Sequence, residues 1–245
     1  MSITNLRVHL APVGFEIDRI VLPAKQRKAD RVWLLVHENK AEDKARPFVE
    51  KIQKQLQKAN IEVVIEYHDR LHLFKIIKTV KEIIEKEKKN NVYVNLASGS
   101  KIQAIGCMMA CMMFNSQKNV YPFYVEAKDY LGFQGPISTG IKNINDIQPY
   151  EIQIPDEKHI HALKIIKEKK GRLTKKEMAE IADEQKLITV NAEEDNYSQA
   201  RFASLDKNII QPLLEKWKFI KVEKIGRARW IEITEEGKNA AEFLI

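Results

Sequence analysis

The stretch Asn91-Val-Tyr-Val-Asn-Leu-Ala-Ser-Gly-Ser-Lys-Ile102 contains both kinds of segment from which the first part of this chain is built. Residues 92–96 are an apolar, β-rich run, and residues 97–100 are all small. Lys101 then opens an apolar segment, residues 102–114, whose length and composition predict a helix. Small residues let a ligand approach the backbone closely, and the amides at a helix start favour phosphate. The stretch therefore predicts a strand, an anion-binding turn and a helix.

Strand-like and helix-like segments alternate on both sides of this stretch. Apolar or β-rich runs predict strands at residues 6–11, 31–37, 61–67 and 120–126. Apolar residues at helical spacing predict helices at residues 42–59 and 71–87. Such alternation implies a Rossmann-like α/β domain, in which helices cover both faces of a parallel sheet. Ligands of these sheets bind beyond the C-terminal strand ends, which is where residues 97–101 fall.

A change of pattern divides the chain. Residues 128–157 lose the alternation and collect glycine and proline, so we expect mainly loop there, with a short strand near residues 150–154. We therefore predict a Rossmann-like, ligand-sensing domain at residues 1–148, a linker at residues 149–157 and a second domain at residues 158–245.

The second domain has the element order of an α+β winged helix-turn-helix. Helical patterns cover residues 159–170 and 174–185, and the capping box Thr174-Lys-Lys-Glu177 opens the latter. A third helix begins near Ser198, and Pro212 interrupts or restarts it. Two strands, at residues 219–224 and 229–234, flank a basic turn, and a closing helix follows. This order places the third helix in the major groove of DNA.

Positive charge gathers where a DNA-binding surface requires it. The formal net charge is +7, and residues 196–231 hold eight Lys or Arg against three Asp or Glu. We predict that the third helix reads bases and that the wing contacts phosphates. The candidates are Ser198, Gln199, Arg201 and Lys207 in the helix, and Lys224, Arg227 and Arg229 in the wing. A solvated charged surface, or a protein–protein contact favoured by the acidic residues 193–195, stays open as an alternative.

Several function classes lack their motifs in this chain. The turn at residues 97–101 fits neither a Walker A loop nor a Gly-x-Gly-x-x-Gly loop, which disfavours an ATPase or a dehydrogenase. Cys107 and Cys111 are four apart on an apolar helix, so we expect buried small side chains rather than a disulfide. His68 and His72 lack a third ligand nearby, and we expect a solvated pair and no metal site. No signal peptide or membrane-spanning run is evident, so we expect a cytoplasmic protein without membrane contact.

The two halves together resemble the CRISPR-associated Rossmann-fold (CARF) regulators with a C-terminal winged helix. One motif is the loop after the first strand, Pro12-Val-Gly-Phe-Glu-Ile17. The other is Asn95-Leu-Ala-Ser-Gly-Ser-Lys101, where family members often have a Thr-Gly-Gly-Thr-Arg-like turn. Residues 97–98 replace the Thr and the first Gly, whereas residues 99–101 keep the pattern. Residues 214–237 are similar to the wing region of many prokaryotic regulators.

This resemblance implies a transcriptional regulator that forms a homodimer, binds double-stranded DNA and senses a cyclic oligoadenylate made by type III CRISPR systems. Cyclic tetra-adenylate is the expected ring, although the departure at residues 97–98 leaves ring size open. The resemblance implies no cofactor and no catalytic residue. Phe15 would pack on a base, while Ser98, Ser100 and Lys101 would contact phosphate or ribose. The implied ligand-binding residues are Gly14, Phe15, Glu16, Asn95, Ala97, Ser98, Gly99, Ser100 and Lys101.

A ring nuclease-like enzyme, which degrades cyclic oligoadenylate and carries an accessory DNA-binding module, is the alternative. Lys101 and Ser98 could orient a 2′-hydroxyl of the bound ring and stabilise charge on the phosphorane. No general base is evident in the sequence, so we predict a regulator rather than an enzyme. A helical ribonuclease, often fused to similar sensors, is disfavoured because no histidine follows His161.

Overall fold

The computed structural model describes residues 5–116, 118–132 and 136–245. The chain divides into two compact units, Met1–Gln153 and Ile154–Ile245, and the boundary falls within the predicted linker. Each unit has its own buried core. In the part of the chain that is described, no helix is both long and apolar enough to cross a bilayer.

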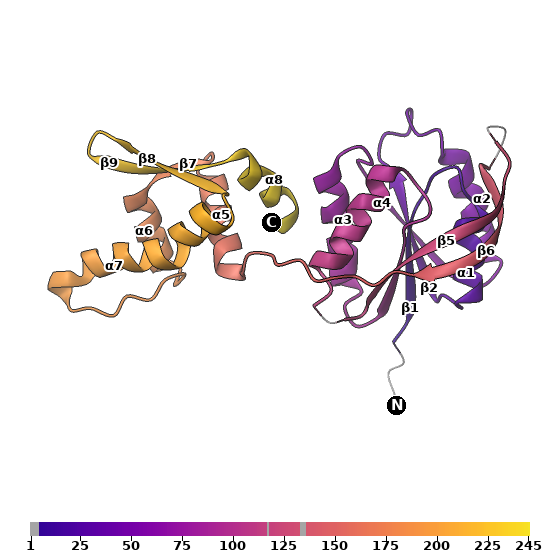
Figure 1. Cartoon of the computed structure of the whole chain (residues 1–245), viewed down its shortest axis with the longest axis horizontal. Helices are drawn as coiled ribbons and strands as arrows, with labels where there is room; N and C mark the ends of the chain where they lie inside the picture. The colour runs from indigo at the N-terminus through magenta and orange to yellow at the C-terminus, as the bar shows by residue number, and fades with distance from the viewer. Residues whose placement is uncertain (1–4, 117, 133–135) are drawn as a thin grey trace. The chain divides into compact units, whose positions relative to one another are not determined.

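The first unit is built on a six-stranded sheet with the order β3-β2-β1-β4-β5-β6 (Figure 1). Strands β1 to β5 are parallel, and β6 pairs with β5 in the antiparallel direction. Their bounds are β1 Arg7–Pro12, β2 Arg31–His37, β3 Glu62–His68, β4 Asn91–Asn95, β5 Val120–Tyr130 and β6 Ser138–Asp146. The predicted Rossmann-like sheet is thus confirmed, with one antiparallel edge strand added.

Helices cover both faces of this sheet. Figure 1 shows α1 (Asp18–Gln26) and α2 (Arg46–Gln57) on one face, and α3 (Leu73–Lys86) and α4 (Lys101–Met113) on the other. The chain therefore leaves β1 toward one face and β4 toward the other. The point between these neighbouring strands is the topological switch point, where ligands of such folds bind. Cys107 and Cys111 of α4 are buried and unbridged, as predicted.

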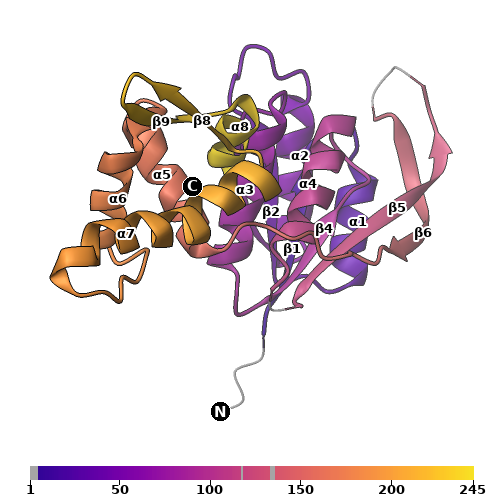
Figure 2. The same cartoon turned by 60° about the vertical axis from the view of Figure 1, so that its left-hand side comes forward.

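The prediction of mainly loop at residues 128–157 holds for residues 147–156 but is wrong for residues 128–130 and 138–146. Strand β5 continues to Tyr130, and β6 returns beside it as a hairpin at the outer edge of the sheet (Figure 2). The reason is a β-bulge: Ala127 pairs with Ile141 and Glu126 with Asn143, which leaves Lys142 as the extra residue. The two isoleucines of β6 are therefore three apart rather than alternating, and the strand pattern is hidden. No strand forms at residues 150–154.

The second unit carries the predicted winged-helix order. Its elements are α5 (Glu157–Glu168), β7 (Arg172–Thr174), α6 (Lys175–Glu184), η1 (Glu194–Asn196), α7 (Tyr197–Leu205), η2 (Asp206–Ile210), η3 (Pro212–Lys216), β8 (Ile220–Ile225), β9 (Ala228–Ile233) and α8 (Glu235–Leu244). The capping box predicted at Thr174 and Glu177 is present. Short β7 was not predicted, and it completes a sheet of order β7-β9-β8.

Pro212 does not end the third helix of this unit. After α7, the helix passes through the wider π-type turns of η2 and η3, with Pro212 at the first position of η3. Proline lacks the amide hydrogen that a regular helix would need there. The wider turns carry the helix past this position, so one continuous element runs from Tyr197 to Lys216.

Candidate ligand site and candidate DNA interface

The side chain of Asn95, which is almost fully buried, fixes the turn after β4 by hydrogen bonds. Its side-chain oxygen accepts a hydrogen bond from the Ala97 amide at 2.8 Å, and its Nδ2 donates to the Arg19 carbonyl at 2.8 Å. That carbonyl has no helical partner because Pro23, four residues on in α1, has no amide hydrogen. Asn95 therefore joins the turn to α1 instead of facing a ligand.

Helix α4 begins with a second capping box that the sequence analysis did not identify. The Ser100 hydroxyl accepts a hydrogen bond from the Gln103 amide at 3.3 Å, and the Ser100 amide donates to Gln103 Oε1 at 2.9 Å. The spacing Ser-x-x-Gln is itself the signal that would have revealed it. Ser100 is thus occupied as the helix cap, and the exposed Lys101 is the first helical residue.

The two predicted ligand loops meet through their glycines. A Cβ on Gly14 would lie 3.0 Å from the Gly99 amide nitrogen, which shows that the backbones touch. Gly99 has φ +77°, and a Cβ there would lie 2.6 Å from Cβ of Pro12. Glycine is needed at Gly99 both for this left-handed conformation and for the close approach. The loops after β1 and β4 therefore form one surface at the switch point.

The remaining residues of the first loop are divided between surface and interior. Phe15 is partly exposed and packs edge-to-face on Phe48, with ring centroids 5.6 Å apart. Glu16 is buried, and its two carboxylate oxygens contact Arg19 at 3.2 Å and the Ser138 hydroxyl. Glu16 thus ties this loop to the β5–β6 hairpin rather than facing a ligand.

Ser98 is the one predicted ligand residue whose polar group is buried without a partner. Its side chain is 2% exposed, and its hydroxyl makes no hydrogen bond to any residue that the structure describes. A buried hydroxyl left unpaired costs about 1–3 kcal/mol. It lies one residue before Gly99, at the start of the turn that leads into α4.

His68, the last residue of β3, is buried, so the prediction of a solvated histidine is wrong for it. Its Nε2 is 3.1 Å from Gln103 Nε2. Burial lowers the pKa of His68 to about 4, and the imidazole is therefore neutral near pH 7. In the described ranges no group of three His, Cys, Asp or Glu side chains could hold a metal ion.

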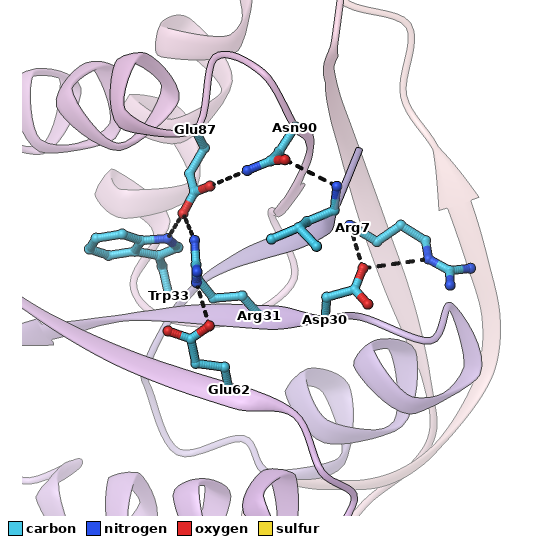
Figure 3. A network of polar contacts seen from close by, with 8 residues as sticks. Arg7, Asp30, Arg31, Trp33, Glu62, Glu87 and Asn90 are labelled. Carbon is cyan, nitrogen blue, oxygen red and sulfur yellow. Dashed lines mark hydrogen bonds and ion pairs between the residues drawn. The ribbon is translucent and has the colours of Figure 1, made fainter. Parts of the chain in front are cut away.

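The opposite end of the sheet carries a separate polar network (Figure 3). Buried Glu87, just after α3, accepts hydrogen bonds from Arg31 at 2.7 Å and from the Trp33 indole at 2.8 Å. Asn90 donates to its other oxygen at 2.6 Å. Arg31 also contacts Glu62 of β3. Since every member has a partner and none faces the switch point, this network fastens α3 to the strands.

The candidate base-reading residues are not equivalent in the structure. Ser198 and Gln199, in the first turn of α7, are exposed, and so is Lys207. Arg201 is half-buried and lies 3.7 Å from the carboxylate of Asp183 in α6. That carboxylate also accepts a hydrogen bond from the Tyr197 hydroxyl at 2.9 Å. Arg201 therefore braces α7 against α6.

The candidate phosphate-binding residues lie on the wing. Lys224 and Arg229 face each other as cross-strand partners of β8 and β9, and Arg227 lies in the turn between these strands. All three are exposed. The guanidinium of Arg172, from β7, lies 4.7 Å from the ring centroid of Trp230 and fixes the base of the hairpin.

Family models match both units. Residues 7–130, just over half of the chain, match the model described as "HFX_2341_N:-like, N-terminal". The chain belongs to this family. In this HFX_2341_N-like chain, residues 158–245 match the model described as "DUF6293 C-terminal winged helix domain", which confirms the winged helix predicted for the second half.

A full-length relative of this HFX_2341_N-like chain is the uncharacterized protein MJ1513 of Methanocaldococcus jannaschii. The two are 24% identical over 97% of this chain and 96% of the relative. They therefore share nearly their whole length.

Similar solved structures include Can2 from Sulfobacillus thermosulfidooxidans in complex with cyclic tetra-adenylate. It has 15% identity and a TM-score of 0.42, over 97% of this chain and 63% of that one. Protein VC1899 from Vibrio cholerae has 13% identity and a TM-score of 0.42, over 96% and 64%. Csm6 from Enterococcus italicus, bound to cyclic hexa-2′-fluoro-hexa-dAMP, has 15% identity and a TM-score of 0.38, over 50% and 33%. This HFX_2341_N-like chain thus spans less than two thirds of each of these proteins.

The predicted resemblance to a CARF regulator agrees with the two-part plan of the chain: a Rossmann-like half, followed by a half that matches a winged-helix family model.

Proposed function

We propose that this protein is a ligand-responsive, DNA-binding transcriptional regulator whose Rossmann-like unit senses a cyclic oligoadenylate. The observation that carries the proposal is the turn at residues 97–101. There the unpartnered Ser98 hydroxyl, the exposed Lys101 and the start of α4 adjoin Gly14 at the switch point. The oxygens of a phosphodiester accept hydrogen bonds from donors of these kinds: amides at a helix start, a hydroxyl and an ammonium group.

The winged helix supports the DNA-binding part of the proposal. Its wing carries three exposed cations, and the first turn of α7 presents Ser198 and Gln199. In this arrangement the wing binds phosphates, and α7 enters the major groove.

Helix α4 supports a homodimer. Ile105 is 52% exposed, and Met108, Met109 and Met112 are half-buried, so this helix presents an apolar stripe beside the candidate ligand turn. A ring-shaped ligand bound across a two-fold axis would use one copy of the turn from each subunit. Ligand binding would then change the relative orientation of the two winged helices and their match to DNA half-sites.

The experiment that tests the proposal is titration calorimetry of purified protein with cyclic tetra-adenylate, the ligand named for Can2. We expect tight binding by the wild type and loss of binding in the Ser98→Ala/Lys101→Ala variant, whose melting temperature should stay near that of the wild type. Full affinity in the variant would refute the proposed site.

The same incubation reports whether the ring is cleaved. His68 is buried against Gln103, so it is poorly placed to act as a general base toward a ligand. We therefore expect the ring to be recovered intact, and the appearance of linear products would favour the ring nuclease alternative.

A further inference from the structure

Gln103 makes more polar contacts than a helix cap requires. Its side chain is 1% exposed in the first turn of α4. Its Oε1 lies 2.9 Å from the Ser100 amide and 3.1 Å from the Ser100 hydroxyl, and its Nε2 lies 3.1 Å from His68 Nε2. One buried amide thus connects the end of β3 to the turn after β4.

The donors and acceptors in this series of hydrogen bonds, from Ser100 through Gln103 to His68, can be assigned from chemistry. A backbone amide can only donate, so Oε1 of Gln103 must face Ser100 and Nε2 must face His68. Gln103 Nε2 is then the donor, and the Nε2 of His68 is the acceptor. The His68 proton must therefore sit on Nδ1, which the neutral ring permits. Reversing the Gln103 amide would place two donors, its own Nε2 and the Ser100 amide, against each other.

The same side chain limits the position of Gly99. A Cβ on Gly99 would lie 2.8 Å from Gln103 Oε1 on one side and 2.6 Å from Cβ of Pro12 on the other. Gly99 is therefore clamped between the loop after β1 and the Gln103 amide, and the orientation of the Ser98–Ser100 backbone follows from that of Gln103.

We infer that Gln103, hydrogen-bonded to Ser100 at one end and to His68 at the other, is a positioning residue that presents the 98–101 turn to the phosphate groups of a nucleotide ligand. This inference rests on the proposed function for the identity of the ligand. Both polar atoms of the Gln103 side chain already have partners within the protein, so Gln103 acts on the ligand through the turn. A simple helix cap would need only the oxygen, and the bond to His68 is what distinguishes the two roles.

Four variants separate these roles. Gln103→Leu removes both halves of the contact. His68→Leu removes the acceptor, whereas His68→Gln can keep one, because a glutamine oxygen can lie close to the position of Nε2. Cys111→Ala is the matched control, because it changes a buried residue of the same helix that lies about two helical turns beyond Gln103.

The first readout is the Kd for cyclic tetra-adenylate, measured with the melting temperature. We expect Gln103→Leu and His68→Leu to bind about tenfold more weakly or worse, the effect of misplacing one or two hydrogen bonds. His68→Gln should bind within about threefold of the wild type, and Cys111→Ala should lower the melting temperature without changing the Kd. A wild-type Kd in His68→Leu would overturn the inference.

The second readout needs no ligand. Amide hydrogen exchange at residues 99–101 should be faster in Gln103→Leu and His68→Leu than in the wild type, and unchanged in Cys111→Ala. If the wild type does not bind cyclic tetra-adenylate, the proposed function fails, yet this comparison still decides whether Gln103 and His68 hold the turn. Equal exchange in all variants would overturn the inference.

Discussion

Gly14 and Gly99 are in backbone contact, although 85 positions separate them in the sequence: a Cβ on Gly14 would lie 3.0 Å from the Gly99 amide nitrogen. The contact joins the turns after β1 and β4, the two neighbouring strands whose helices lie on opposite faces of the sheet. Both glycines lie inside these turns, so the two turns pack directly against each other. The candidate ligand surface is therefore formed by both turns together.

Replacing Gly99 with alanine should break this surface. The new Cβ would lie 2.6 Å from Cβ of Pro12, at a residue whose φ is +77°. We expect the free energy of unfolding to fall by about 1–3 kcal/mol and ligand binding to be lost with it. Urea denaturation and calorimetry with cyclic tetra-adenylate measure the two effects.

Gly132→Ala is the matched control for that variant. Gly132 has a similar φ of +80°, but no atom of the described residues lies within 4 Å of its Cβ position. It should therefore show only the smaller penalty of a left-handed alanine, about 1 kcal/mol, with ligand binding retained. Equal loss of stability in the two variants would contradict the close packing of Gly99.

The sheet, the strand–turn–helix at residues 91–113 and the winged helix could be predicted because their signals are local. Residues 92–101 contain the β-rich run, the small residues and the helix start in sequence order. The spacing of Thr174 and Glu177 is that of a capping box. Strand β6 was missed because the bulge at Lys142 breaks its alternation. Helix α1 was missed because Pro23 lies inside it.

The details of the site could not be predicted because they depend on loops that meet only in the folded sheet. Glu16 was predicted to bind ligand, but its carboxylate accepts hydrogen bonds from Arg19 and Ser138. His68 looked solvated because it ends a strand, yet Gln103 of α4 covers it. Ser138 and Gln103 are far from these residues in sequence, so no local pattern could show those two contacts, whereas Arg19, three residues after Glu16, was a nearby signal for the ion pair.

The Glu87 network predicts a loss of stability in acid. Burial by itself raises the pKa of Glu87, but the hydrogen bonds from Trp33, Arg31 and Asn90 outweigh it, so the pKa lies below its ordinary value. A carboxyl with a depressed folded pKa stabilises the protein above the ordinary glutamate value of about 4.3. That contribution disappears as the pH falls through the folded pKa.

Glu87→Gln should therefore lower the free energy of unfolding at pH 7 by about 1–3 kcal/mol and flatten its decline below pH 5. Urea denaturation at a series of pH values measures both effects. Glu62→Gln is the control, because Glu62 contacts the same Arg31 from a largely exposed position and should change stability by less than about 1 kcal/mol. An unchanged pH dependence in Glu87→Gln would contradict the network.

Arg201 and Lys207 should behave differently toward DNA, although both were predicted to bind it. Arg201 is held by Asp183 at 3.7 Å, whereas Lys207 is exposed. Removing a phosphate contact lowers the slope of log affinity against log salt by about one. We expect this change in Lys207→Ala and not in Arg201→Ala, which should instead lower the melting temperature. A reduced slope in Arg201→Ala would show that it leaves Asp183 to contact DNA.

Charge reversal on the wing should weaken DNA binding in a salt-dependent way. Arg227 and Arg229 are exposed at and beside the β8–β9 turn, and their only role in the proposed complex is to neutralise phosphates. In Arg227→Glu/Arg229→Glu we expect weaker binding at low salt and a slope reduced by about two, measured by fluorescence anisotropy with duplex DNA. Lys238→Glu, a reversal on α8 of the same unit, should leave the slope unchanged. A wild-type slope in the wing variant would move the phosphate contacts away from the hairpin and leave α7 as the remaining candidate.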